Sequence, residues 1–280
     1  MTGSDFTPIA LGLASAACWG AGDFCGGLAS KRTHVYSVII TSQIVGVGLL
    51  IGLALAFGEA LPALDQLALG GAAGFAGAIG LLALYRALAT SRMGVAAPIA
   101  AIVGAAMPVI VGAIIDGVPG GLQLLGFAVA LIAVWLITQA PDAVLRLREL
   151  TLPLAAGLAF GVFFVLIGLI RDGAVFWPLV AARGTSLGAL LITATLSHQP
   201  RLTDRSHWRL VVLVGVMEVG GNAFYALAGQ TGRLDVAAVI SSLYPATTVW
   251  LAWVVLKERL SRQQLIGVVA ALAAIVLISV

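Results

Sequence analysis

Three ionisable side chains lie inside long apolar stretches of the sequence: Asp23, Arg183 and Glu218. A charged group within a membrane-spanning segment is costly, so it usually marks a functional site or has an opposite charge beside it. Asp23 follows Trp19 by four residues, and the two side chains therefore share one face of a helix. The Asp23 carboxylate is a candidate to bind a substrate amine or a coupling proton. The alternative is an ion pair with Lys31 or Arg32 near the end of the same segment, or a position in interfacial water.

Arg183 carries a permanent charge in the middle of the apolar stretch 175–197. Its planar guanidinium suits a substrate carboxylate, which can accept two parallel hydrogen bonds from it. A structural ion pair between Arg183 and Glu218 would explain the same residue without a ligand. An internal repeat, described below, places Gln43 at the position that matches Arg183.

Glu218, Asn222 and Tyr225 are spaced four and three residues apart, which puts them on one face of a helix. A carboxylate, an amide and a phenol in one row suit a polar ligand with some apolar or aromatic bulk. An interhelical hydrogen-bond seam is the alternative. The predicted substrate-binding residues are Trp19, Asp23, Gln43, Arg183, Glu218, Asn222, Tyr225 and Tyr244.

Prolines are expected to interrupt two of the apolar stretches. Pro98 and Pro108 stand in the stretch 94–115, and Pro245 follows Tyr244 in the stretch 234–256. A proline removes one helix hydrogen bond, and the freed carbonyl needs a partner in a cavity or on a neighbouring helix. Such breaks, with Tyr244 beside one of them, point to the site or to a hinge, and a kink that only serves packing is an equally good alternative.

The sequence lacks the usual signatures of an enzyme. It contains no Gly-x-x-x-x-Gly-Lys-Ser/Thr loop for nucleotide phosphates, and its histidines His34, His198 and His207 stand in connectors without metal-ligand spacing. No nucleophile and base pair occurs at helical spacing within an apolar stretch. We expect a protein that is not an enzyme and that needs no metal or cofactor.

The composition predicts that lipid is the main solvent of this chain. Of its 280 residues, 61% are hydrophobic and 10% are charged, and the mean hydropathy is +1.09. A soluble domain has about a quarter of its residues charged. The formal net charge is +3, but the basic residues lie in short connectors and not on one face, so no nucleic-acid partner is expected.

Ten apolar stretches approach the length of about 20 residues that a helix needs to cross a bilayer. They lack the alternating pattern of barrel strands, so an all-α membrane protein is expected. The connectors between them leave no room for a soluble domain. The ten stretches are 8–29, 36–57, 66–88, 94–115, 120–138, 152–171, 175–197, 207–229, 234–256 and 262–279.

The two halves of the chain resemble each other. "PIALGLA" at 8–14 matches "PLAAGLA" at 153–159, and "RMGVAAPI" at 92–99 matches "RLDVAAVI" at 233–240. The chain therefore reads as two units, 1–140 and 150–280, with five spans each. An odd number of spans forces the second unit to insert upside down, and such inverted repeats are typical of transporters with a substrate site near the bilayer midplane.

The basic residues are unequally divided between the two sides of this arrangement. Positively charged loops stay in the cytoplasm, so the odd-numbered connectors are expected to be cytoplasmic and both termini external. The other side has only Arg171 and Arg233 in its connectors. The basic residues of the odd-numbered connectors are Lys31, Arg32, Arg92, Arg146, Arg148, Arg201, Arg205, Arg209, Lys257, Arg259 and Arg262.

Several segments, taken in order, resemble the drug/metabolite transporter superfamily, of the EamA-type ten-helix group. They are Trp19-Gly20, "LYRALATSRMGVAAPI" at 84–99, "FYALAGQTGRLDVAAVISSLYP" at 224–245 and "LKERLSRQQLIGVVAALAAIVLIS" at 256–279. The resemblance implies secondary transport by alternating access around a central cavity, commonly the export of amino acids or other small metabolites. Many relatives are expected to keep both termini in the cytoplasm, which the charge distribution here contradicts.

The leading hypothesis is thus a multi-pass protein of the cell membrane that exports a small molecule such as an amino acid, with a proton as a candidate coupling ion. Efflux of lipophilic drugs is the alternative, and a non-transporting structural membrane protein is the alternative from a different class. The sequence leaves the substrate, the direction of transport, the coupling ion and the oligomeric state open.

Overall fold

The computed structural model describes residues 6–90, 93–137, 147–170, 173–257 and 261–279. All the regular elements in these residues are helices, as the sequence predicts. They are α1 (Phe6–Ser30), α2 (Val35–Ala56), α3 (Leu64–Thr90), α4 (Met93–Ile115), α5 (Gly121–Ile137), α6 (Leu147–Gly168), α7 (Phe176–Leu196), the 3₁₀ helix η1 (Arg205–His207), α8 (Trp208–Thr231), α9 (Leu234–Ser241), α10 (Tyr244–Leu256) and α11 (Arg262–Ser279).

Seven helical stretches within the described residues are long and apolar enough to cross a membrane. Three more apolar stretches are shorter: Ile99–Ile115, Gly121–Leu136 and Arg262–Ile278. Large apolar side chains remain exposed along the outside of the bundle, where lipid would cover them. The protein is therefore an integral membrane protein with multiple spans.

Only one of the two expected proline interruptions is present. The stretch 234–256 is divided into α9 and α10, and Pro245 stands in the first turn of α10, where its missing N–H costs nothing. By contrast, α4 runs without a break from Met93 to Ile115 through Pro98 and Pro108. The expectation of a break in 94–115 is wrong, because a proline inside a helix removes one hydrogen bond without always ending the helix.

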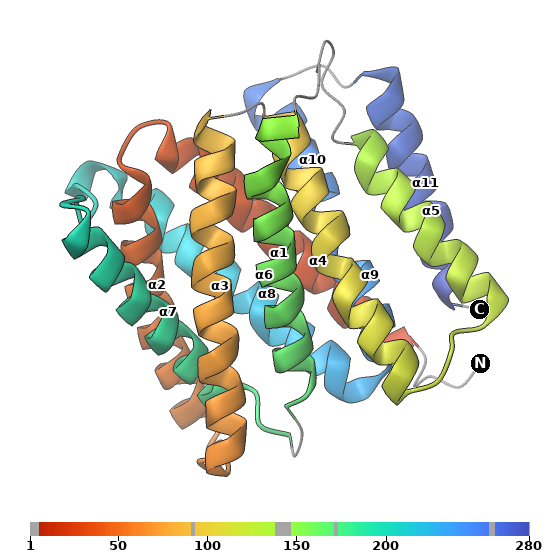
Figure 1. Cartoon of the computed structure of the whole chain (residues 1–280), viewed down its shortest axis with the longest axis horizontal. Helices are drawn as coiled ribbons and strands as arrows, with labels where there is room; N and C mark the ends of the chain where they lie inside the picture. The colour runs from red at the N-terminus through yellow and green to blue at the C-terminus, as the bar shows by residue number, and fades with distance from the viewer. Residues whose placement is uncertain (1–5, 91–92, 138–146, 171–172, 258–260, 280) are drawn as a thin grey trace.

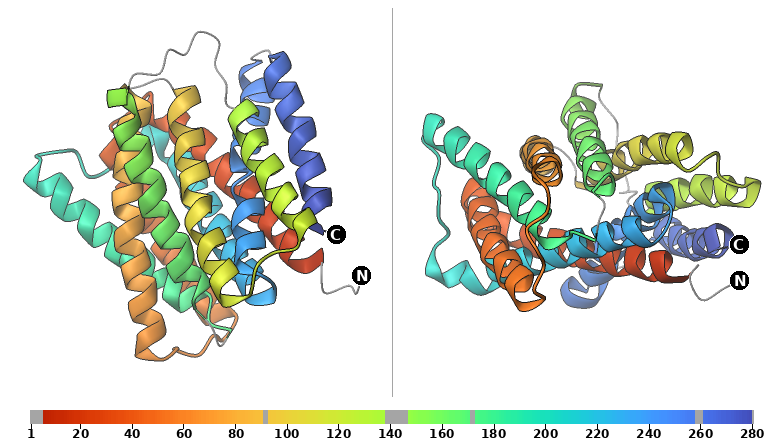
Figure 2. Two further views of the ribbon diagram at one scale, coloured as in Figure 1. Left: turned by 45° about the vertical axis from the view of Figure 1, so that its right-hand side comes forward. Right: turned by 90° about the horizontal axis from the view of Figure 1, so that it is seen from below.

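The helices form one bundle with two lateral pairs. Figure 1 shows α2 and α7 on one side and α5 and α11 on the other, and the view from below in Figure 2 agrees. Between these pairs, α1 packs on α8, while α6 packs on α3 and α4. The predicted site residues come from the central helices and from the pair α2 and α7, so the bundle brings together segments that are far apart in the sequence.

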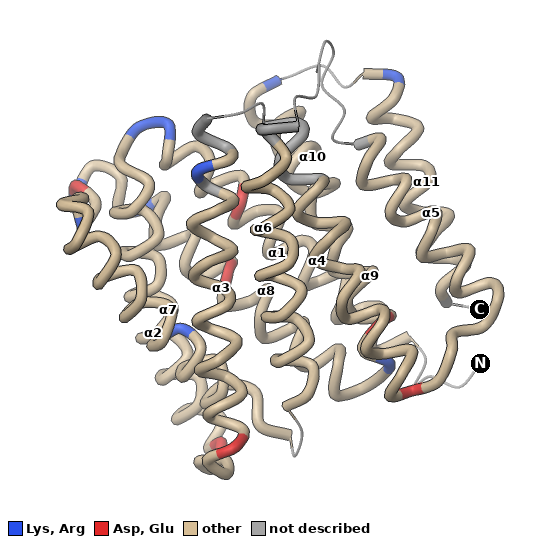
Figure 3. Tube along the Cα trace, viewed as in Figure 1, with Lys and Arg blue, Asp and Glu red and all other residues tan. Residues whose placement is uncertain are grey.

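The two ends of the bundle differ in charge. Both chain termini lie at one end, called here the terminal end (Figure 1). Most of the Lys and Arg lie at the opposite end, called here the basic end (Figure 3). Of the residues used above, Arg92, Arg146, Arg171 and Arg259 lie outside the described residues, as does the segment 138–146 that contains the expected boundary between the two units.

Candidate functional site

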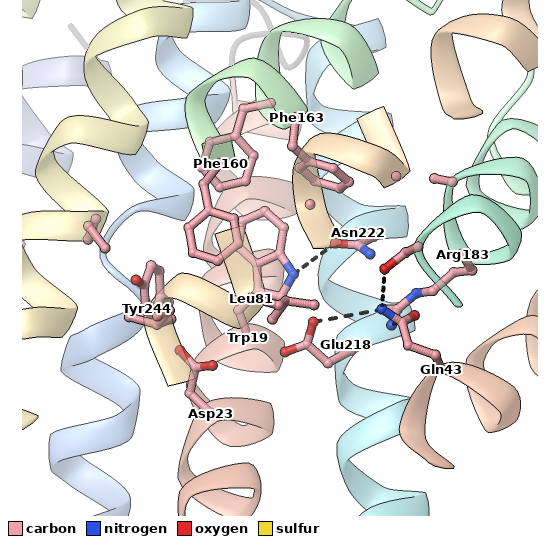
Figure 4. Close-up of a pocket in the computed structure, with 18 residues that line it drawn as sticks. Trp19, Asp23, Gln43, Leu81, Phe160, Phe163, Arg183, Glu218, Asn222 and Tyr244 are labelled. Carbon is pink, nitrogen blue, oxygen red and sulfur yellow. Dashed lines mark hydrogen bonds and ion pairs between the residues drawn. The ribbon is translucent and has the colours of Figure 1, made fainter. Parts of the chain in front are cut away.

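A cavity lies in the centre of the bundle, with an empty volume of about 780 Å³ that includes its open mouth. Its lining includes both ionisable and aromatic side chains (Figure 4). Seven of the eight predicted site residues line it: Trp19, Asp23, Gln43, Arg183, Glu218, Asn222 and Tyr244. They come from α1, α2, α7, α8 and α10, so both halves of the chain contribute to this cavity.

Arg183 is held from two sides. Its Nη1 donates a hydrogen bond of 2.7 Å to Oε1 of Gln43, and Nε2 of Gln43 donates one of 2.9 Å to Oγ of Ser186. On the other side, Oε2 of Glu218 lies 3.8 Å from Nη2 of Arg183. The Gln43 contact is a short charge-assisted hydrogen bond, whereas the Glu218 contact is a longer ion pair. The guanidinium is thus anchored by Gln43 and has a looser partner in Glu218.

Ser186 is a lining residue that the sequence reasoning missed. It follows Arg183 by three residues, so it shares the Arg183 face of α7. That spacing would have allowed Ser186 to be identified from the sequence. Its hydroxyl accepts the amide proton of Gln43 and so fixes the amide orientation that presents Oε1 to Arg183.

Trp19 lines the cavity and lies above Asp23 in the view of Figure 4. Its Nε1 donates a hydrogen bond of 3.0 Å to Oδ1 of Asn222. Its ring lies 5.3 Å from that of Phe164 between centroids, and it packs directly on Gly221, where any Cβ would meet the indole. The indole is therefore fixed both by a polar contact and by close packing.

Tyr225 is not among the residues that line the cavity. Its side chain is 0% exposed, and its Oη donates a hydrogen bond of 3.0 Å to the carbonyl oxygen of Phe164. The predicted row of Glu218, Asn222 and Tyr225 continues along α8, but α6 covers its last member. In this structure Tyr225 supports Trp19 from behind, with 5.7 Å between the ring centroids.

Asp23 lies at the cavity and not in an ion pair at the membrane surface. Within the described residues, which include both basic residues of the next connector, no ion pair joins Asp23 to Lys31 or Arg32. Figure 4 shows Asp23, Glu218 and Tyr244 around one space below Trp19. Two carboxylates therefore face the same cavity, and one of them has Arg183 beside it.

An aromatic wall of α6 completes the cavity and was also missed from the sequence. It consists of Phe160, Phe163 and Phe164, and the rings of Phe163 and Phe164 meet edge to face at 5.6 Å. The run "FGVFF" at 160–164 reads equally well as lipid-facing residues, so the sequence alone does not show which way it points. Gly77 of α3 lies against Phe163 and allows α3 to approach this wall.

The fold and this cavity define a multi-pass helical membrane protein with a cavity lined by charged and aromatic side chains. A comparison with known protein families finds one match. Residues 147–280 match the model of the EamA-like transporter family. This part of the chain, just under half of its length, is similar to that family, in line with the resemblance noted in the sequence.

A solved structure, entitled only "Crystal structure of protein", has the same fold. It shares 16% sequence identity with this chain, superposes with a TM-score of 0.80, and the match covers 98% of each chain. At this identity the likeness concerns the fold alone. A search of curated proteins finds no match to the sequence.

Proposed function

We propose that this chain is a secondary transporter of the cell membrane that exports a small metabolite, such as an amino acid, by alternating access. The observation that carries the proposal is the meeting of Arg183, Glu218 and Asp23 in one cavity between the two halves. A small molecule with both a carboxylate and an ammonium group would find a partner for each.

Each lining group has a role in this proposal. Arg183 binds the substrate carboxylate, and Gln43 holds the guanidinium in position for it. Asp23 or Glu218 binds the substrate ammonium or a coupling proton. Trp19 and Tyr244, with the aromatic wall of α6, contact the apolar part of the substrate.

The proposed architecture is ten spans arranged as two inverted repeats, 1–140 and 150–280, with α9 and α10 together as the ninth span. The packing supports this architecture, because each of these helix contacts has a counterpart in the other half. The contact of α1 with α8 corresponds to that of α6 with α3, and the contact of α4 with α6 corresponds to that of α9 and α10 with α1. Alternating access would then be a rocking of one repeat against the other around the cavity.

Flux in proteoliposomes tests the assignment. A thermal-shift screen with the common amino acids first selects a substrate, and its proton-driven flux is then measured for Glu218→Gln and Asp23→Asn. We expect at least one variant to lose most of its flux and the pH dependence of the remainder. Asp204→Asn, which removes an exposed carboxylate in a connector, is the matched control and should keep full flux. Unchanged flux and pH dependence in both cavity variants would refute the assignment.

The aromatic wall favours a second candidate function, the efflux of lipophilic compounds. Such substrates would bind Phe160, Phe163 and Trp19 without needing a cation in the cavity. Arg183→Gln separates the two functions in a resistance panel of an expressing strain. Resistance that survives this substitution would favour lipophilic efflux, whereas amino-acid export should be lost with Arg183.

A further inference from the structure

Glu59, at the terminal end of the bundle, reaches from the first half of the chain to the second. It stands in the connector between α2 and α3, and its carboxylate accepts hydrogen bonds from three successive backbone N–H groups at the start of α7. The distances are 3.0 Å from Val175, 2.9 Å from Phe176 and 2.8 Å from Trp177. The indole Nε1 of Trp177 donates a further bond of 2.8 Å to the Glu59 carbonyl oxygen.

This contact replaces an ordinary helix cap. The first N–H groups of a helix have no partner within the helix, and the helix dipole favours an anion at that end. The N-cap residue of α7, Val175, forms no side-chain cap, so a carboxylate from the other half takes that role. The rings of Phe57 and Phe176 stack beside it at 5.5 Å between centroids.

Arg233 makes the reverse connection, from the second half to the first. Its Nη1 donates to the carbonyl oxygen of Asp116 at 3.1 Å and its Nη2 to that of Gly117 at 2.6 Å, just beyond the end of α4. Asp235, which is 0% exposed, accepts two hydrogen bonds from the same guanidinium. These hydrogen bonds from Arg233 to Asp235 are the main cause that raises the pKa of Arg233, so the guanidinium remains charged.

The two contacts are complementary. A carboxylate of the first half binds the positive end of α7, and a guanidinium of the second half binds the negative end of α4. Both helices carry walls of the cavity, α7 with Arg183 and α4 with Ala100. Opening the cavity toward the terminal end would therefore require both contacts to separate.

We propose that Glu59 and Arg233 form a gate that holds the terminal end of this transporter closed. The proposal builds on the proposed function, since a gate has a purpose only if the cavity opens alternately to the two sides. At the basic end, the corresponding connector between α7 and α8 meets α2 through the neutral pair Thr41 and Thr203, at 3.4 Å between the hydroxyl oxygens. Within the described residues, the Glu59 and Arg233 contacts thus join the two halves through charged groups at the terminal end, whereas the Thr41 and Thr203 contact at the basic end is neutral.

Cysteine accessibility tests this gate without any transport assay. The reporter is Ala182→Cys, a buried position of the cavity wall, in a background with Cys18 and Cys25 replaced by serine. A maleimide that cannot cross the membrane is added on the side from which an exposed reference, Leu61→Cys, is labelled. Glu59→Gln and Arg233→Gln should each raise the labelling rate of the reporter about tenfold, since a hydrogen bond to a charged group is worth roughly this factor.

Asp65→Asn is the matched control. It removes a carboxylate at the start of α3 whose described contact is with its neighbour Gln66 and not with α7, and it should leave the labelling rate unchanged. If Glu59→Gln does not fold, Phe57→Leu weakens the same junction by removing the ring stacking and should shift labelling in the same direction.

The outcomes separate the gate from the transport function. Unchanged labelling in both the Glu59 and the Arg233 variants would overturn the gate, even if the wild-type protein transports amino acids. Faster labelling in these variants supports the gate, even if no amino acid is transported and the proposed substrate is wrong.

Discussion

Trp19 shows how a single residue joins the polar and the apolar parts of the cavity. Its indole N–H donates a hydrogen bond to Asn222, while its ring packs against the rings of Phe164 and Tyr225 and directly on Gly221. A hydrogen bond between buried side chains of a membrane bundle contributes about 0.6 kcal/mol on average, because the unfolded chain in the membrane also finds partners. Packing on Gly221 adds to this contribution, so the position should tolerate little change.

Trp19→Phe removes the indole N–H and leaves the Asn222 amide without that partner. We expect the free energy of unfolding to fall by about 1 kcal/mol and substrate affinity to fall with it. Thermal unfolding in detergent, with and without substrate, measures both effects. Trp250→Phe is the control, since Trp250 is 53% exposed on the outside of the bundle. Equal stability of the two variants would show that the contact with Asn222 contributes nothing measurable.

Glycine pairs have different effects on helix packing, depending on what the helix face that carries them contacts. The sequence contains several pairs spaced four residues apart, among them Gly48 with Gly52 and Gly70 with Gly74. A Cβ added at Gly70 or Gly74 would meet the backbone of α7, whereas a Cβ at Gly48 or Gly52 would meet no atom within 4 Å. The same spacing therefore allows close approach between α3 and α7 but has no such role in α2.

Gly70→Ala should consequently destabilise the protein, and Gly48→Ala should not. Overpacking at a close helix contact costs about 1 to 3 kcal/mol, which exceeds the gain of about 1 kcal/mol from replacing glycine by alanine in a helix. Melting temperatures of the two variants test this: we expect a fall for Gly70→Ala and no change or a rise for Gly48→Ala. The reverse order would mean that α3 and α7 do not approach as closely as the structure shows.

Orientation is a property of the whole molecule. The described connectors at the basic end carry Lys31, Arg32, Arg201, Arg205 and Lys257, and positively charged loops stay in the cytoplasm. We therefore expect the basic end to be cytoplasmic and both termini external, against the orientation expected from many relatives.

Two exposed leucines at opposite ends of the bundle allow this orientation to be measured. Leu61 is 68% exposed in the connector between α2 and α3, and Leu202 is 64% exposed in the connector between α7 and α8. In a background without Cys18 and Cys25, an impermeant maleimide should label Leu61→Cys in intact cells and Leu202→Cys only after permeabilisation. The opposite pattern would place the termini in the cytoplasm.

Much of the architecture could be predicted because lipid imposes strong constraints on a sequence. Apolar stretches must be helical to satisfy their backbone, and helix bounds follow from where polar residues begin. The same constraint identified Asp23, Arg183 and Glu218 as candidate site residues, since a charge in an apolar stretch is energetically costly and is usually kept for function or for an ion pair. The break at Pro245 was foreseen, but the expected break in α4 was not found, because a proline has a different cost in the first turn than inside a helix.

The sequence by itself determined that this chain is a helical membrane protein, which helices contain charges, and which residues share a helical face. Only the tertiary structure decided which faces meet: that Arg183 is held by Gln43 and Ser186, that Tyr225 lies behind Trp19, and that Asp23 faces the cavity instead of Lys31. The physical reason is that periodicity describes one helix at a time. The partner of a face depends on close packing between segments more than 100 residues apart, such as α1 and α8.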